Sequence, residues 1–170
     1  MALSAHLTAR RDAILHAWRD VSAPEPAQTT VSFLTRTQFN DHIPQLLDAF
    51  ERKLRARPGG TRAAVADHDK KSDDVKHGLQ RWQQGYRLGE LMHEWGHLHV
   101  CIFAEITAFA AAHPELEPAT GETAQRELIA LIHEGIAEST GQYARMQQAE
   151  AAGHARDLQR TLDHVTDLQR

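Results

Sequence analysis

The sequence predicts an all-α protein, on three observations. Patterns of alternating apolar and polar residues, typical of strands, are almost absent, whereas apolar residues recur at three-and-four spacing from one end to the other. The chain of 170 residues is 41% apolar and 25% charged, which suits one soluble domain with its own core. We therefore expect a four-helix-type bundle, with a long C-terminal helix that extends as a dimeric coiled-coil connector.

The first two helices are predicted on either side of a proline-containing linker. The first begins behind Ser4 as its N-cap and ends at the turn that starts with Ser22. The second spans about 37–57, with Pro44 close to its start, where a missing N–H costs little. The sequence Pro58-Gly-Gly is expected to end it.

The third and fourth helices are predicted from a polar stretch, a glycine and a proline. Residues 68–74 lack apolar periodicity and predict a loop or an exposed helix start. A third helix follows, and Gly85 marks a break before a fourth helix over about 88–112, which stops at His113-Pro114. The expected buried row of the fourth helix consists of Leu88, Leu91, Trp95, Leu98, Ile102, Ile106 and Phe109.

A last helix of about fifty residues is predicted to begin near Thr120. Its end has a narrow apolar stripe among many charges, as in coiled coils. The stripe consists of Leu158, Leu162, Val165 and Leu168. The tail either packs back on its own chain or pairs with a second copy and leads into a further domain. We favour pairing, which divides the chain into a bundle input domain, 1–146, and a connector helix, 147–170, toward an output domain.

Charge and cysteine content narrow the functional classes. The formal net charge is −4, so no global basic field is available to hold nucleic acid or an anionic membrane surface. The start of the chain lacks a basic leader followed by an apolar run, and Cys101 is the single cysteine. We expect a cytoplasmic protein that binds neither nucleic acid nor a membrane.

The motif His93-Glu94-Trp-Gly-His97 matches the zinc-hydrolase pattern, in which two histidines one turn apart bind the metal and the glutamate acts as general base. On a helical wheel both histidines lie opposite the apolar row, away from the expected core. The best candidates for a third ligand lie on the last helix and are His133, Glu134 and Glu138. A zinc-dependent hydrolase, or a metal-responsive switch that binds zinc or another divalent metal, is therefore the alternative, and solvated polar residues without a cofactor are favoured.

The remaining histidines, out of 12 in the chain, are mostly expected at the surface. His68, His77, His113 and His154 stand among polar residues. His99 lies at the edge of the apolar row, where it would be a core or interface histidine, or a pH-sensitive group.

Two segments carry a resemblance to a known family. The first is DHIPQLLD at 41–48, and the second runs from 77 to 98 with the series His77, Arg81, Gly85, Tyr86, Leu88, Glu90, Leu91, Glu94, Trp95 and Leu98. Together they resemble the N-terminal helical domain of bacterial sensor histidine kinases and are similar to the RsbT co-antagonist (RsbRD) N-terminal domain family. The resemblance covers most of residues 10–146. His99 stands where the family pattern leads us to expect arginine.

The resemblance implies a cytoplasmic sensory and dimerisation domain of a two-component sensor histidine kinase, without catalytic activity of its own. A homodimer would relay a signal from a small ligand or protein partner, through its last helix, to a kinase domain in the same chain. We expect a polar cluster of Arg81, Tyr86, Glu90 and Glu94 to set the helix arrangement. Arg81 paired with a glutamate one or two turns onward would otherwise simply fasten the break at Gly85.

Overall fold

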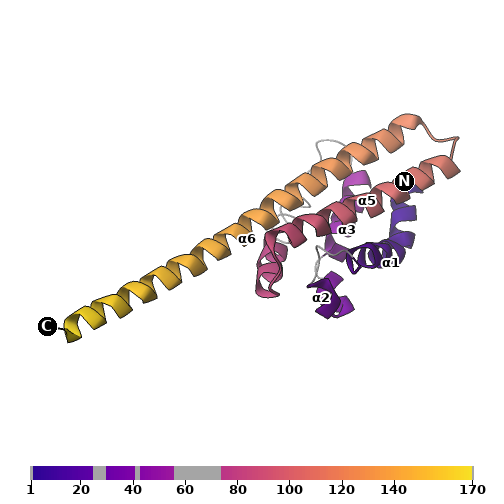
Figure 1. Cartoon of the computed structure of the whole chain (residues 1–170). Coiled ribbons are helices and arrows are strands. Elements are labelled where there is room, and N and C mark those ends of the chain that lie inside the picture. The colour runs from indigo at the N-terminus through magenta and orange to yellow at the C-terminus, as the bar shows by residue number, and fades with distance from the viewer. Residues whose placement is uncertain (1, 25–29, 41–42, 56–73, 170) are drawn as a thin grey trace.

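The computed structural model of the chain describes residues 2–24, 30–40, 43–55 and 74–169. All regular structure in these residues is helical, as predicted, and no strand occurs among them. Figure 1 shows the order of the elements along the chain. They are α1 (Ala2–Ser22), the short 3-10 helix η1 (Val31–Phe33), α2 (Arg36–Asn40), α3 (Ile43–Arg55), a helical segment at 74–83, α5 (Leu88–Ala112) and α6 (Pro118–Leu168).

Two antiparallel helices, α5 and α6, form the frame against which the other helices pack (Figure 1). Helix α1 packs along α5, α3 packs along α6, and α1 and α3 contact each other. Apolar residues at three-and-four spacing give α5 and α6 one continuous buried side each, because such residues recur on one face of a helix.

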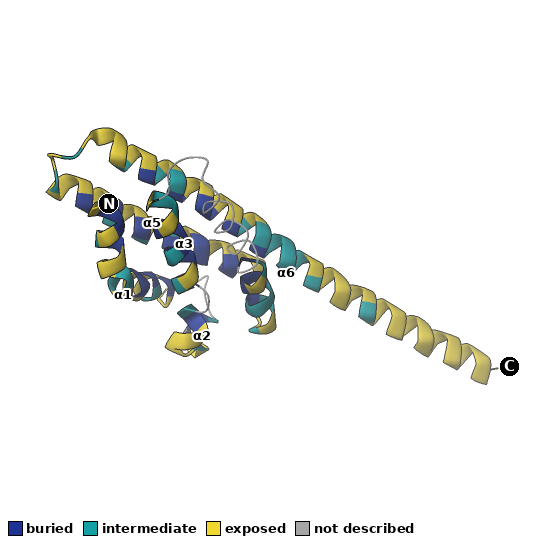
Figure 2. Ribbon diagram, turned by 180° about the vertical axis from the view of Figure 1, so that it is seen from behind, coloured by how far each residue is buried: buried dark blue, intermediate teal, exposed yellow. Residues whose placement is uncertain are grey.

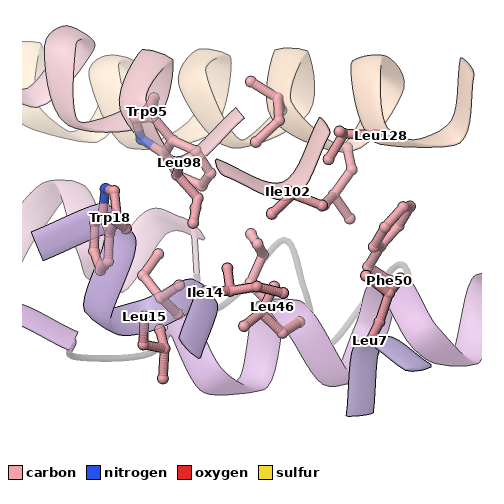
Figure 3. Close-up of a cluster of buried hydrophobic side chains, with 14 of the residues drawn as sticks. Leu7, Ile14, Leu15, Trp18, Leu46, Phe50, Trp95, Leu98, Ile102 and Leu128 are labelled. Atoms are coloured by element: carbon pink, nitrogen blue, oxygen red, sulfur yellow. The ribbon is translucent and has the colours of Figure 1, made fainter. Parts of the chain in front are cut away.

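The core lies between these four helices. Figure 3 shows Leu7, Ile14 and Trp18 of α1, Leu46 and Phe50 of α3, and Trp95, Leu98 and Ile102 of α5 directed toward one another, with Leu128 of α6. Trp18 also donates a hydrogen bond from its indole nitrogen to the Glu94 carbonyl oxygen at 2.9 Å. That bond satisfies the polar atom of the largest side chain that α1 buries.

Helix α6 is one continuous helix of 51 residues, which confirms the predicted length. Its buried residues are Ala124, Leu128, Leu131, Ile132, Gly135, Ser139 and Tyr143. Beyond Gln147 nearly every side chain is exposed, and Figure 2 shows this part extending away from the other helices. Leu158, Leu162, Val165 and Leu168 are 45–73% exposed.

Several predicted boundaries differ from the structure. Helix α1 begins at Ala2, so Ser4 is a buried residue inside the helix rather than its N-cap. The predicted second helix corresponds to α2 and α3, with residues 41–42 between them outside the described residues, and Pro44 is the second residue of α3. The predicted stop at Pro58-Gly-Gly lies outside the described residues, as does His68.

The predicted break at Gly85 is confirmed. Gly85 has a φ of +80°, a left-handed conformation that only glycine adopts without a steric penalty. Arg87 is the N-cap of α5, and its backbone N–H donates to the Glu90 carboxylate at 2.7 Å. The C-terminal end of α5 at Ala112 is also as predicted, with His113 as C-cap. Of the seven residues in the expected buried row, Leu88 alone was placed wrongly, because it is 37% exposed.

Candidate functional site

A buried ion pair joins the helical segment 74–83 to α5. The Arg81 side chain is 0% exposed and the Glu94 side chain 1% exposed. The Arg81 Nε donates to both Glu94 carboxylate oxygens, at 2.8 and 3.1 Å, and Nη2 donates to Oε1 at 2.5 Å. Charged groups are rarely buried unless they are paired and hydrogen-bonded in this way, because desolvation of each charge is costly.

The rest of the Arg81 guanidinium fastens the short helix α2. Nη1 donates to the Gln38 carbonyl oxygen at 3.0 Å, and Nη2 donates to the Phe39 carbonyl oxygen at 2.6 Å. These two carbonyls belong to the end of α2, where helical carbonyls lack partners within the helix. The guanidinium carbon also lies 5.0 Å from the Tyr86 ring centroid and 5.7 Å from that of Phe39, within reach of cation–π attraction.

His77 completes the buried cluster and was missed by the sequence analysis, which placed it at the surface. Its side chain is 1% exposed, and Nε2 lies 3.6 Å from the Glu94 carboxylate. The imidazole meets Trp95 edge to face, with ring centroids 5.5 Å apart. His77 precedes Arg81 by four residues, so both point from one side of their helix toward α5. This four-residue spacing from Arg81 was the one feature of the sequence that could have indicated that His77 belongs to the cluster.

The pKa of Glu94 follows from these contacts. Burial alone would favour the neutral acid, but the charge of Arg81 and the hydrogen bond with His77 outweigh it, and the pKa of Glu94 lies below its ordinary value. Burial, reinforced by the nearby Glu94 carboxylate, raises the pKa of Tyr86. The cluster therefore holds a carboxylate that stays ionised and a phenol that stays protonated at neutral pH.

Two hydrogen bonds connect this region to the last buried residues of α6. The Trp95 indole donates to the Ser139 hydroxyl oxygen at 2.9 Å, and Ser139 donates to the Gly135 carbonyl at 2.6 Å. The Tyr143 hydroxyl donates to the Tyr86 carbonyl at 2.5 Å. Tyr143 is the last residue of α6 that is fully buried, so these bonds lie where α6 leaves the other helices.

Two glycines bring the helices close enough for these bonds. A Cβ at Gly78 would lie 2.0 Å from the Ser139 carbonyl oxygen, and a Cβ at Gly135 would lie 2.3 Å from the Trp95 ring. Neither distance is possible between real atoms. The glycines therefore fix the distance between segment 74–83 and α6, and between α5 and α6, at the cluster.

The structure brings together part of the predicted polar cluster. Arg81, Tyr86 and Glu94 lie together as expected, whereas the Glu90 side chain bonds other groups beside the cluster. Its carboxylate caps α5 and accepts hydrogen bonds from the Thr30 backbone and hydroxyl, at 3.0 and 3.3 Å. His99 lies farther along α5, outside the cluster. Its pKa is lowered, first by burial and then by the charge of His133 on α6.

A pocket of about 370 Å³ adjoins the ion pair. It is lined by Thr37, Gln38, Gln80, Gln83 and Gln84. Gln84 accepts a hydrogen bond from Arg81 Nη1 at 2.9 Å, and the buried Gln80 Oε1 has no hydrogen-bond partner among the described residues. A polar molecule in this pocket would therefore lie one hydrogen bond away from the Arg81 guanidinium.

The residues of the zinc-hydrolase motif serve other contacts. Glu94, the expected general base, is bonded to Arg81, while His93 is exposed and His97 contacts Ser22, with 3.1 Å between His97 Nδ1 and Ser22 Oγ. The His93 and His97 ring centroids lie 6.3 Å apart. Among the described residues, which include Glu134 and Glu138, no group of three or more histidine, cysteine or acidic side chains is arranged to hold a metal ion.

Comparison of the chain with protein-family models, with curated proteins and with solved structures finds no match.

Proposed function

We propose that this chain is the sensory and dimerisation domain of a cytoplasmic two-component sensor histidine kinase. In this proposal it has no catalytic activity of its own and relays a signal through α6 to a kinase domain in the same chain. The helices form a four-helix-type bundle, and the exposed part of α6 pairs with a second copy as a coiled coil. The resemblance at 41–48 and 77–98 points to the same function.

One observation carries the proposal. The buried ion pair of Arg81 and Glu94 lies beside the last buried turns of α6, and Trp95 and Tyr143 connect the two regions by hydrogen bonds. A ligand that prefers one arrangement of the Arg81 contacts would shift the balance between two arrangements of α6. Small shifts at such a site become discrete helix movements because packed interfaces deform in steps rather than continuously.

The pocket beside Arg81 supports a polar, uncharged ligand as the signal. Its described lining offers amide and hydroxyl groups, which hydrogen-bond neutral donors and acceptors, and none of these described side chains is charged. A ligand that donates a hydrogen bond to Gln80 Oε1 would satisfy an acceptor that has no partner among the described residues. Contact with Gln84 would compete directly with its bond to Arg81.

The test joins residue 170, in helical register, to the catalytic core of a histidine kinase and measures autophosphorylation. Tyr143→Phe removes only the hydroxyl that reaches the Tyr86 carbonyl, and Trp95→Phe removes the bond to Ser139. Each is expected to change autophosphorylation by roughly 2- to 30-fold, the range that 0.5–2 kcal/mol of coupling produces. Asp12→Asn, at an exposed position of α1, is the control. Unchanged phosphorylation in both phenylalanine variants, with both proteins folded, would overturn the proposal.

A further inference from the structure

The solvent side of α5 has an unusual composition. Helix α5 contains three charged residues, Glu90, Glu94 and Glu105, if histidine is counted as neutral. The first two are buried, and Glu105 is bonded to Arg10 of α1 at 2.9 Å. Apart from Glu105, which is 19% exposed and paired with Arg10, the exposed surface of this 25-residue helix carries no aspartate, glutamate, lysine or arginine, in a chain in which one residue in four is charged. Exposed helix faces are ordinarily covered with charged and polar residues.

Apolar and small residues follow this surface at coiled-coil spacing. They are Gly89, His93, Gly96, Val100, Phe103, Thr107 and Ala110, separated alternately by four and three residues, and all are exposed. Val100 is 66% exposed and Phe103 40% exposed, and Met92 beside them is 50% exposed. Such a series forms one continuous line along a helix that meets a second helix.

Among the described residues, no side chain or backbone packs against Gly89 or Gly96 of this line. A Cβ at Gly89 or Gly96 would meet nothing within 4 Å, and neither glycine has a positive φ. A glycine inside a helix costs about 1 kcal/mol relative to alanine. The cost is offset if another backbone approaches closely at these positions, as segment 74–83 approaches Ser139 at Gly78.

The neighbouring helix continues the same surface. Ile129 of α6 is 42% exposed, and it is followed at the same four-and-three spacing by His133, Ile136 and Thr140. His133 lies near enough to His99 of α5 for its charge to lower the pKa of that histidine. Helices α1 and α3 pack elsewhere on the α5–α6 pair. We call the exposed residues of α5 and α6 in these two series the α5–α6 face.

We propose that the α5–α6 face binds the same face of a second copy of this chain, so that two α5–α6 pairs form the centre of a dimer. A two-fold axis places one patch against itself, so an excess of one charge on the patch would repel its copy. The two series that define the α5–α6 face contain no aspartate, glutamate, lysine or arginine, so no such excess of acidic or basic side chains opposes the pairing.

The exposed tail of α6 makes a second copy the occupant that fits best. Counted at 100° per residue, Leu158, Leu162 and Val165 fall on the side of α6 that carries Ile129 and Ile136. A partner helix that covers the tail stripe and continues along α6 therefore also covers the α5–α6 face. The charged residues that flank the tail stripe, Arg156, Asp157, Arg160 and Asp163, suit a coiled coil rather than a lipid surface.

A membrane is the competing occupant. Helix α5 is the one described helix that is long and apolar enough, by length and composition alone, to cross a bilayer. Its two buried glutamates and the bonds that tie it to α1, to segment 74–83 and to α6 argue for a helix that stays in a folded protein. The experiment therefore includes lipid vesicles.

The inference rests on the proposed function only for the premise that two copies associate.

Sedimentation equilibrium of the full chain measures the dimer Kd of the wild type, Val100→Glu and Gly96→Leu, with Phe33→Glu as control. Phe33 is 85% exposed and lies on η1, outside the α5–α6 face. We expect Val100→Glu and Gly96→Leu to raise Kd at least ~10-fold, because a like charge or a bulky side chain at a closely packed interface costs more than about 1.4 kcal/mol. The control is expected to leave Kd unchanged.

The tail variant Leu158→Glu/Leu162→Glu separates the two proposals. If the tail variant alone abolishes the dimer and Val100→Glu leaves Kd unchanged, the inference fails while coiled-coil pairing stands. A wild type that is monomeric at tens of micromolar, or that instead binds phosphatidylcholine–phosphatidylglycerol vesicles through Val100, would also overturn it. Circular dichroism checks that each variant keeps the helical content of the wild type.

Discussion

The Arg81 guanidinium meets the Glu94 carboxylate across the Gly85 turn, 13 residues later in the chain, with the two side chains 0% and 1% exposed. Together with the contact of His77 with Trp95, the pair therefore joins the helices on either side of this turn. The Arg81 guanidinium also donates hydrogen bonds to the Gln38 and Phe39 carbonyl oxygens, which fastens α2 to the pair. A single buried charge pair thus positions three helical elements, which makes it the first place to test the structure.

Removal of one partner of this pair should be strongly destabilising. Arg81→Met leaves the Glu94 carboxylate buried beside His77 without its main counter-charge, and we expect a loss of about 3–5 kcal/mol in the free energy of unfolding. The double variant Arg81→Met/Glu94→Met should lose less than the single one, because no charge remains buried. Urea unfolding followed by circular dichroism gives both values.

The exposed pair of Arg160 and Asp157 provides the control for that measurement. Its side chains are 80% and 73% exposed, with a closest distance of 3.4 Å. Arg160→Met should change the free energy of unfolding by less than about 0.5 kcal/mol, because water and salt screen such pairs. An equal loss for Arg81→Met and Arg160→Met would mean that the buried pair does not hold the helices.

The Gly85 turn should tolerate no side chain. Gly85→Ala forces a residue with a Cβ into a φ of +80°, and we expect it to cost about 1–2 kcal/mol even though a Cβ there meets nothing within 4 Å. Gly153→Ala is expected to have the opposite effect on stability. Gly153 lies inside the exposed part of α6 with open space around it, so alanine should stabilise the helix by about 1 kcal/mol. Thermal unfolding of the two variants shows whether Tm falls for Gly85→Ala and rises for Gly153→Ala.

The elements that the sequence predicted well are those whose signal is local. Gly85, the stop at His113-Pro114 and the apolar rows of α5 and α6 depend on the conformational preference or periodicity of neighbouring residues. The start of α1 depends instead on how that end packs on other helices. Ser4, for instance, accepts a hydrogen bond from the distant Arg55 instead of capping a helix.

The candidate site was predicted in part, for a similar reason. Pairing of Arg81 with a glutamate could be expected because the two residues lie close together in the sequence, on either side of the break at Gly85. The burial of His77 could not, because its sequence neighbours are polar and the residues that enclose it, Trp95 and Glu94, come from another helix. Gly78 and Gly135 were missed as well, since close approach of two backbones leaves no periodic signal.

Acid should destabilise the protein partly through His99. Its pKa is lowered in the folded state, so the unfolded chain takes up the proton first as the pH falls. The contribution to stability is present above the ordinary pKa of about 6.5 and is lost as the pH falls through the folded value. His99→Gln should therefore reduce the difference in Tm between pH 7.5 and pH 5.5. His154→Gln, at an exposed position, should leave that difference as it is in the wild type.

The close packing of helices at the cluster gives the last prediction. At Gly78, an added Cβ would overlap the Ser139 backbone, which cannot move without displacing α6. We expect Gly78→Ala to destabilise the fold by at least about 1–3 kcal/mol, the usual cost of overpacking, and to weaken the bond between Trp95 and Ser139. Near-ultraviolet circular dichroism and tryptophan emission report the second effect, since a Trp95 indole that loses its partner changes both spectra.

The matched control uses a glycine of α6 that is not enclosed, two residues beyond Ser139. A Cβ at Gly141 would come within 3.6 Å of the end of the Arg145 side chain, which is flexible and exposed. Gly141→Ala should therefore be neutral or stabilising, with unchanged tryptophan spectra, because alanine favours the helix and meets no backbone. Equal stability of Gly78→Ala and Gly141→Ala would contradict the close contact between segment 74–83 and α6, and with it the path from Arg81 to the exposed end of that helix.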